Sequence, residues 1–195
     1  MAEKITGIIL AGGKSTRMGT DKAHVEISRK KIISYVFEIL TIVTNSIMII
    51  SNSDNGNFLN VPVYPDIIKG RGPLGGIYTG LNYSATEKNI FLSCDIPFIT
   101  VDLLNFLINA SNEFEITVPE HKGKIEPLCG VYSKSCSEKI KTILFSDNFK
   151  LHDAINMFNS KKMNVENESF YNSKLLANIN TPEELKKYTE VANEN

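Results

Sequence analysis

Cysteine is scarce in this chain of 195 residues, which contains only Cys94, Cys129 and Cys136. The number is odd and no two cysteines have the CxxC spacing. Both facts argue against a disulfide framework and against a zinc site. We therefore expect reduced thiols, as in a cytoplasmic protein.

Long apolar runs and an excess of one charge are also missing. No run of about 18 apolar residues occurs, so we expect no membrane-spanning segment, and the N-terminus lacks the apolar region of a secretory signal. The formal net charge is −1, which predicts no binding to nucleic acid or to a membrane surface. Hydrophobic residues make up 42% of the chain, enough for a substantial core, and the length suits one domain spanning residues 1–195.

Short apolar segments alternate with segments of helical spacing as far as about residue 110. The predicted strands cover 5–10, 46–50, 61–64, 89–93, 115–118 and 127–132. The predicted helices cover 31–43, 77–84, a segment capped by Thr100, 135–144, 152–158 and a segment opened by Thr181-Pro182. This alternation is typical of βαβ units and predicts an α/β fold with a mostly parallel sheet and flanking helices.

The most informative stretch is LAGGKSTRMGTDK, residues 10–22, directly after the first predicted strand. Open α/β folds bind ligands at that end of a strand. Gly12 and Gly13 allow backbone N–H groups to approach phosphate oxygens closely. Three cations follow: Lys14, Arg17 and Lys22. The combination favours a triphosphate site over an ordinary charged surface turn.

Two common glycine motifs fit this chain less well. The P-loop pattern GxxxxGK[ST] would need a glycine where Ile8 stands, so it is absent around Gly13. The dinucleotide pattern GxGxxG does occur, at Gly70, Gly72 and Gly75, but it contains Pro73 and follows no clean strand end. We therefore disfavour a dehydrogenase.

Three polar residues follow predicted strands. Asp95 ends the fourth strand, where a carboxylate is costly unless it is paired or binds a metal. Mg²⁺ prefers one or two carboxylates together with phosphate oxygens, so we predict that Asp95 binds Mg²⁺; the alternative is a cap of the turn before Pro97. Asp66 and Asn52 are candidates for contacts to a base or ribose, or else ordinary turn and loop residues.

Six segments, in this order, resemble the molybdenum cofactor guanylyltransferase (MobA) family. They are residues 10–22, YPD at 64–66, GPLGGI at 72–77, CDIP at 94–97, EPLCGVY at 126–132 and NINTPEEL at 178–185. The resemblance implies a Rossmann-like nucleotidyltransferase fold. It also implies a cytoplasmic enzyme that transfers GMP from Mg-GTP to a molybdopterin-type molybdenum cofactor and releases pyrophosphate.

The resemblance further implies the roles of individual residues. The nucleotide would be bound by Leu10, Ala11, Gly12, Gly13, Lys22, Asn52, Asp66, Gly75 and Asp95. The catalytic residues would be Arg17, Lys22 and Asp95, with the two cations stabilising the triphosphate and the departing pyrophosphate. Asp95 would bind Mg²⁺, and Asn180 would lie near the metal or the cofactor.

The acceptor side matches the family less closely. Glu126 stands where the family often has a neutral polar residue, and an inward-pointing carboxylate would oppose a phosphorylated acceptor. His24, His121 and His152 have no partner at a readable spacing, so we expect no His–acid pair. None is needed, because an acceptor phosphate is already anionic. Transfer of a cofactor also suggests transient contact with enzymes that deliver or receive it.

Three alternatives stay open at this point. The first is a relative that uses CTP, in which position 12 is more often alanine than glycine. The second is a nucleotidyltransferase for a sugar or polyol phosphate. The third is a nucleotide-binding protein without activity, which the presence of Arg17, Lys22 and Asp95 argues against.

Overall fold

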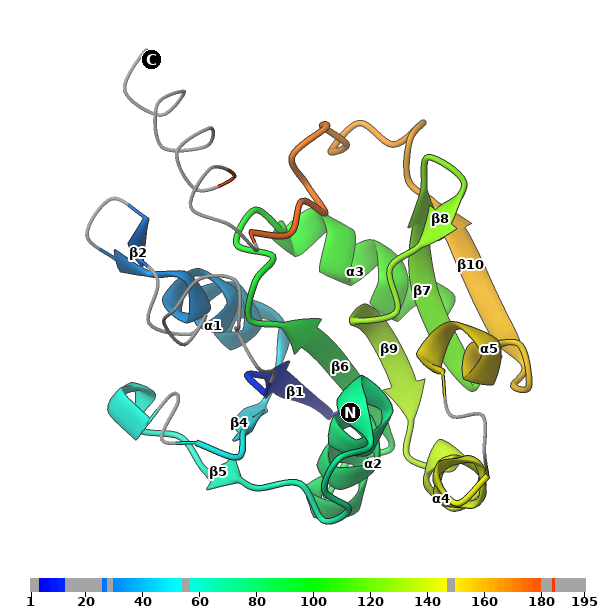
Figure 1. The fold of residues 1–195 in the computed structure, drawn as a ribbon. Helices are drawn as coiled ribbons and strands as arrows, with labels where there is room; N and C mark the ends of the chain where they lie inside the picture. The colour runs from blue at the N-terminus through cyan, green and yellow to red at the C-terminus, as the bar shows by residue number, and fades with distance from the viewer. Residues whose placement is uncertain are drawn as a thin grey trace.

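The computed structural model describes residues 4–12, 26–27, 30–53, 57–146, 150–179 and 184 (Figure 1). One eight-stranded sheet runs through these residues in the order β10-β7-β9-β6-β1-β4-β5, with β8 paired to β7. A separate ribbon pairs β2 (Glu26–Ile27) with β3 (Lys30–Lys31).

The eight strands of the large sheet include both parallel and antiparallel neighbours. They are β1 (Ile5–Leu10), β4 (Ser46–Ile50), β5 (Val63–Tyr64), β6 (Lys88–Ser93), β7 (Ile116–His121), β8 (Lys124–Ile125), β9 (Cys129–Ser133) and β10 (Ser160–Asn164). The pairs β1–β4, β1–β6, β4–β5 and β7–β10 are parallel, whereas β9 runs antiparallel to β6 and β7. The predicted α/β fold with a mostly parallel sheet is confirmed.

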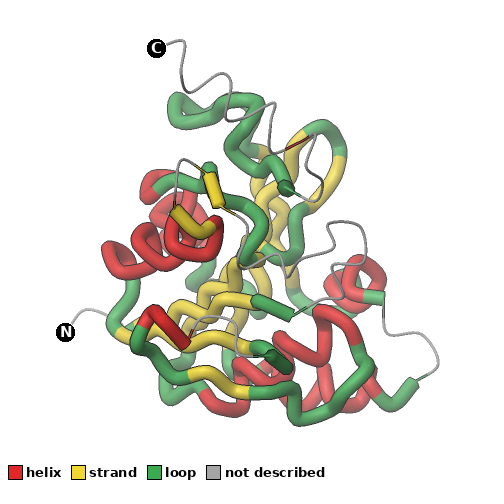
Figure 2. The backbone as a smooth tube through the Cα atoms, turned by 60° about the vertical axis from the view of Figure 1, so that its left-hand side comes forward, coloured by secondary structure: helices red, strands yellow, loops and turns green. Residues whose placement is uncertain are grey.

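Helices cover both faces of the sheet (Figures 1 and 2). They are α1 (Ile32–Val43), α2 (Gly72–Tyr83), α3 (Val101–Ala110), α4 (Cys136–Leu144) and α5 (Leu151–Ile155), with a 3₁₀ turn η2 (Asn57–Leu59). One core cluster contains side chains of α1 and α3, and the other contains side chains of α2, α4 and α5.

The alternation of side chains along β1 explains why its sequence is apolar throughout. Ile5 and Ile9 belong to the cluster of α1 and α3, whereas Ile8 and Leu10 belong to the cluster of α2 and α4. A strand buried on both faces has no solvent-facing side chains and therefore reads as a continuous apolar run. Packing on both faces, together with pairing to β4 and β6, thus fixes the carboxyl end of β1 in the middle of the sheet.

The structure differs from the sequence-based expectation at the second helix and in four strands that were not predicted, β2, β3, β8 and β10. α2 begins at Gly72 rather than at residue 77, with Pro73 in its first turn, where a missing N–H costs nothing. The glycine-rich stretch is therefore the start of the helix. β10 was not predicted, because SKKMN has neither an apolar run nor a strict alternation. Thr100 does cap α3, its Oγ1 accepting from Leu103 N at 3.3 Å, as expected.

Candidate active site

A cavity of about 600 Å³ lies where the parallel strands β1, β4, β5 and β6 end. The residues that line it are Leu10, Ala11, Gly12, Ile50, Ser51, Asn52, Ser53, Asp66, Gly70, Gly72, Pro73, Gly76, Ser93 and Leu128. Ligands of open α/β sheets bind outside the carboxyl ends of the strands, which is the position of this cavity. The structure therefore brings together the predicted segment 10–12, Asn52 and Asp66.

The chain just beyond β1 is held by its neighbours on both sides. Ala11 N donates to Ile50 O at 3.0 Å, and Cys94 N donates to Leu10 O at 3.1 Å. A Cβ atom built on Gly12 would have no other atom within 4 Å. The backbone at Gly12 therefore faces open space in the cavity, as the approach of a phosphate requires.

Asn52 and Asp66 form a reciprocal pair at the rim of the cavity. Asn52 Nδ2 donates to Asp66 Oδ2 at 2.7 Å, and Asp66 N donates to Asn52 Oδ1 at 3.1 Å. The segment after Asp66 is tied to α2, since Ile67 N donates to Thr79 Oγ1 at 3.0 Å. The carboxylate of Asp66 is thereby held in a defined orientation.

Asp95 lies just beyond β6 and is only 8% exposed. Its Oδ1 accepts a hydrogen bond from Ser93 Oγ at 2.5 Å, and its backbone oxygen accepts one from Ile179 N at 2.9 Å. Ser93, rather than Asp95, lines the cavity. Ser93 is a site residue that the sequence did not suggest, although its position two residues before the predicted metal ligand was a usable signal.

The donor set around Asp95 bears on the kind of metal site that the chain can form. Among the described residues, no group of three or more His, Cys, Asp or Glu side chains could enclose a metal ion. A protein cage of the zinc type is therefore not formed by that part of the chain. One carboxylate next to the cavity, hydrogen-bonded to the lining residue Ser93, does fit Mg²⁺, which is usually bound through few carboxylates and through phosphate oxygens.

The two glycines in the first turns of α2 have different surroundings. A Cβ on Gly75 would lie 3.1 Å from Arg71 Cβ and 3.2 Å from Ile68 O, so Gly75 allows close packing of the preceding loop. Gly76, not Gly75, lines the cavity, and a Cβ there would lie 3.8 Å from Asp66 Oδ1. The predicted nucleotide contact of Gly75 stays a prediction, with Gly76 the better placed of the two.

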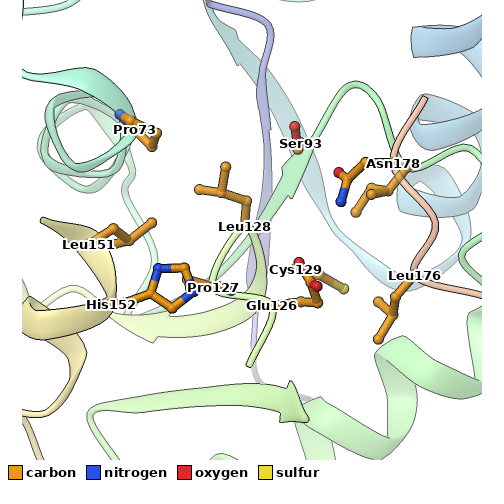
Figure 3. A pocket seen from close by; sticks show the side chains of 11 residues that line it. Pro73, Ser93, Glu126, Pro127, Leu128, Cys129, Leu151, His152, Leu176 and Asn178 are labelled. Carbon is orange, nitrogen blue, oxygen red and sulfur yellow. The ribbon is translucent and has the colours of Figure 1, made fainter. Parts of the chain in front are cut away.

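A second, smaller cavity of about 210 Å³ adjoins the first (Figure 3). It is lined by Pro73, Ser93, Ile96, Glu126, Pro127, Leu128, Cys129, Leu151, His152, Leu176 and Asn178. Pro73, Ser93 and Leu128 line both cavities. Burial, and secondarily the charge of Glu126, raises the pKa of the Cys129 thiol well above its usual range. Cys129 therefore stays protonated and contributes apolar surface.

The expectation that no His–acid pair would form is wrong. His121 Nε2 lies 3.4 Å from Glu126 Oε1, with the two side chains 15% and 28% exposed. The β7–β8 hairpin brings them together through a tight turn in which Lys122 and Gly123 have positive φ. The spacing of five residues between His121 and Glu126 is typical neither of a helical pair nor of a metal site, so the sequence alone did not indicate their contact. His152, for which the sequence predicted no partner, lines the smaller cavity.

Several of the predicted site residues belong to the part of the chain that the structure does not describe. Gly13, Lys14, Arg17, Lys22, His24 and Asn180 lie outside the described residues. Of the helix expected after Thr181, only Glu184 is described, and it is helical. Their predicted roles stay predictions.

Comparison with known proteins agrees with this geometry. The MobA-like NTP transferase domain matches residues 7–156. This chain belongs to the MobA-like NTP transferase family. A relative in Carboxydothermus hydrogenoformans, named "Probable molybdenum cofactor guanylyltransferase", is 35% identical over 191 residues, covering 97% of each chain. A relative of the same name in Flavobacterium johnsoniae is 38% identical over 185 residues, covering 94% of this chain and 95% of that one.

A solved structure shares the fold of this chain. Molybdopterin-guanine dinucleotide biosynthesis protein A from Archaeoglobus fulgidus has a TM-score of 0.81 at 22% identity, covering 97% of this chain and 100% of that one. The chain is thus a nucleotidyltransferase, and enzymes of this type generally need a divalent metal ion. Within the described segments, no helix combines the length and the apolarity needed to cross a membrane.

Proposed function

We propose that this MobA-like NTP transferase transfers GMP from Mg-GTP to a phosphorylated, molybdopterin-type molybdenum cofactor and releases pyrophosphate. The relatives' names support this assignment of the substrates. The observation that carries it is the junction of two cavities, both lined by Ser93, at the end of β6 next to Asp95. A transfer between two bound substrates needs such adjoining sites.

The larger cavity would hold GTP. The triphosphate would lie against the backbone of residues 10–13, where N–H groups can approach phosphate oxygens. Arg17 and Lys22 would neutralise charge on the triphosphate and on the departing pyrophosphate. Asn52, Asp66 and Gly75, or its neighbour Gly76, would contact the nucleoside. The reciprocal pair of Asn52 and Asp66 supports a fixed polar contact there.

The smaller cavity would hold the acceptor, with its phosphate at the junction near Ser93. An oxygen of that phosphate would attack the α-phosphorus of GTP while the bond between the α-phosphorus and the bridging oxygen to the β-phosphate breaks. The nucleophile is already anionic, so no side chain needs to remove a proton. Asp95 would bind Mg²⁺, which when bound offsets negative charge on phosphate oxygens.

Pyrophosphate release tests this function directly. The purified protein is given Mg²⁺, the acceptor and one of GTP, CTP, ATP or UTP. We expect release only with acceptor present, and fastest with GTP. Preference for CTP would identify the cytidylyl relative instead, and saturable GTP binding without any release would identify a silent nucleotide-binding protein.

The proposal also covers the domain organisation and the location of the protein. We propose one nucleotidyltransferase domain over residues 1–195, working in the cytoplasm, where thiols such as Cys94 stay reduced. Transient contact with enzymes that deliver or receive the cofactor is part of this proposal.

A further inference from the structure

We propose that Glu126 selects the pterin end of the acceptor by accepting hydrogen bonds from its amino-oxo-pyrimidine edge. This inference rests on the proposed function, because it concerns the acceptor cavity. It goes beyond that function by assigning a specificity-determining role to one side chain of that cavity.

The walls of the smaller cavity are largely apolar. Apolar side chains from α2, α5 and the segment 176–178 line it, among them Pro73, Leu151 and Leu176 (Figure 3). Proline and leucine side chains offer an apolar surface without competing polar groups. The Glu126 side chain is 28% exposed, so water can reach its carboxylate. A ligand ring that displaced this water would have to supply hydrogen-bond donors in its place, because an unsatisfied carboxylate in apolar surroundings is costly.

The protein satisfies this carboxylate only in part. Within the described part of the chain, His121 is the one hydrogen-bonding partner of the Glu126 side chain, reaching Oε1 at 3.4 Å. An ionised carboxylate has two oxygens with about four acceptor sites. Glu126 thus has accepting capacity to spare for a ligand in the cavity.

The backbone holds Glu126 in a defined place. Glu126 N donates to Pro119 O at 3.0 Å, and Cys129 N donates to Glu126 O at 3.0 Å. The next residue is fixed as well, since Tyr132 Oη donates to Pro127 O at 2.7 Å in the buried core. A recognition group on a pinned backbone loses little freedom when a ligand binds, which favours selectivity.

Charge determines which end of the acceptor meets Glu126. A phosphate beside this carboxylate would bring two negative charges together in an apolar cavity, which is strongly unfavourable. The phosphate belongs instead at the junction with the nucleotide cavity, where Ser93 lies. Figure 3 shows Ser93 separated from the Glu126 carboxylate around the cavity. The opposite end of the acceptor is the pterin.

The pterin carries the matching chemistry. Its pyrimidine ring has a ring N–H next to an exocyclic amino group, so two donors point the same way. A carboxylate can accept both in parallel, and charge-assisted bonds of this kind are stronger than neutral ones. A neutral amide at position 126 has only one accepting oxygen and would turn its own N–H groups toward one of these donors. Glutamate at position 126 is thus the better match.

Binding of free pterin tests this directly, without GTP or turnover. Pterin is compared with lumazine, in which an oxygen replaces the exocyclic amino group, by titration of the ligand fluorescence at neutral pH. We expect the native protein to bind pterin at least about tenfold more tightly than lumazine, the effect of one charge-assisted hydrogen bond. Glu126→Gln should reduce that preference to about twofold or less.

A matched control is the neighbouring residue Glu120. It lies on the same hairpin, paired with Ile125, but does not line the cavity. Glu120→Gln should therefore keep the preference for pterin. An equal thermal shift with GTP in all three proteins would show that each is folded. Absence of saturable pterin binding, equal binding of pterin and lumazine by the native protein, or an unchanged preference in Glu126→Gln would each overturn the proposal.

Kinetics separate this inference from the proposed function. In the pyrophosphate assay, Glu126→Gln should raise KM for the acceptor about tenfold while KM for GTP stays the same. Failure of the native protein to transfer GMP, together with intact pterin selection, would remove the guanylyl assignment and leave the role of Glu126. Normal transfer of GMP without a preference for pterin would keep the guanylyl assignment and remove the proposed role of Glu126.

Discussion

Asn52 and Asp66 hold each other through two hydrogen bonds, although they follow different strands, β4 and β5. The side-chain amide of Asn52 donates to the Asp66 carboxylate at 2.7 Å and accepts from the Asp66 backbone N–H at 3.1 Å. Asparagine can do both because its amide has a donor and an acceptor. The pair fixes one polar wall of the larger cavity.

Asn52→Asp should weaken GTP binding by about tenfold or more, because it replaces the donor by a second carboxylate facing Asp66. Calorimetric titration with Mg-GTP measures the loss. The control is Asn156→Asp, an exposed residue that lines neither cavity and whose side chain accepts a hydrogen bond from Lys162. Equal affinities in the native and Asn52→Asp proteins would show that the pair does not shape the nucleotide site.

Asp95→Asn should lower the rate of pyrophosphate release by about 100-fold or more, because a neutral amide is a much poorer ligand for Mg²⁺. The side chain keeps its shape, so the thermal midpoint should change little. Asp102→Asn, in the exposed first turn of α3, is the matched control. Near-normal turnover in Asp95→Asn would remove this carboxylate from the reaction.

Gly12→Ala should separate folding from nucleotide choice. The built Cβ meets nothing within 4 Å, and Gly12 is not among the glycines with positive φ, so the free energy of unfolding should stay the same or rise by up to about 1 kcal/mol. The methyl group would instead enter the cavity and weaken GTP binding. Thermal shifts with GTP and CTP measure the change in preference. A loss of stability without ligand would mean that glycine is needed for the fold.

Cys136 should make stability depend on alkaline pH. Burial, and next the charge of Glu115, raises its pKa from 9.0 to about 12. Below pH 9 the thiol is protonated in both states, so its contribution is fully present; above pH 9 the unfolded chain loses the proton first and stability falls. The native protein should therefore lose up to about 1.4 kcal/mol per pH unit relative to Cys136→Ala above pH 9. Urea unfolding of both proteins at pH 8, 9 and 10 tests this. If the difference in their free energies of unfolding stayed the same at all three pH values, the prediction would be contradicted.

Local pattern was enough for the elements that carry the nucleotide cavity. The apolar runs at 5–10, 46–50 and 89–93 predicted β1, β4 and β6, because each is only five or six residues long, too short for a typical helix, and is followed by turn-forming residues. Residues 10–12 and Asn52, which lie at or just beyond the ends of these strands, do line that cavity. Parallel strands end at a common edge of the sheet, so the residues that follow them were expected to lie close together.

The smaller cavity could not be predicted from the sequence. Its lining comes from α2, the segment 126–129, α5 and the segment 176–178, which are far apart along the chain and meet only through the antiparallel insertion of β9 between β6 and β7. The pairing of His121 with Glu126 likewise depends on a turn with two positive φ values. The sequence by itself determined which segments form the parallel strands and which residues follow them, since both depend on local patterns along the chain. Only the tertiary structure decided where Glu126 lies and which side chains surround it, because long-range packing places them there.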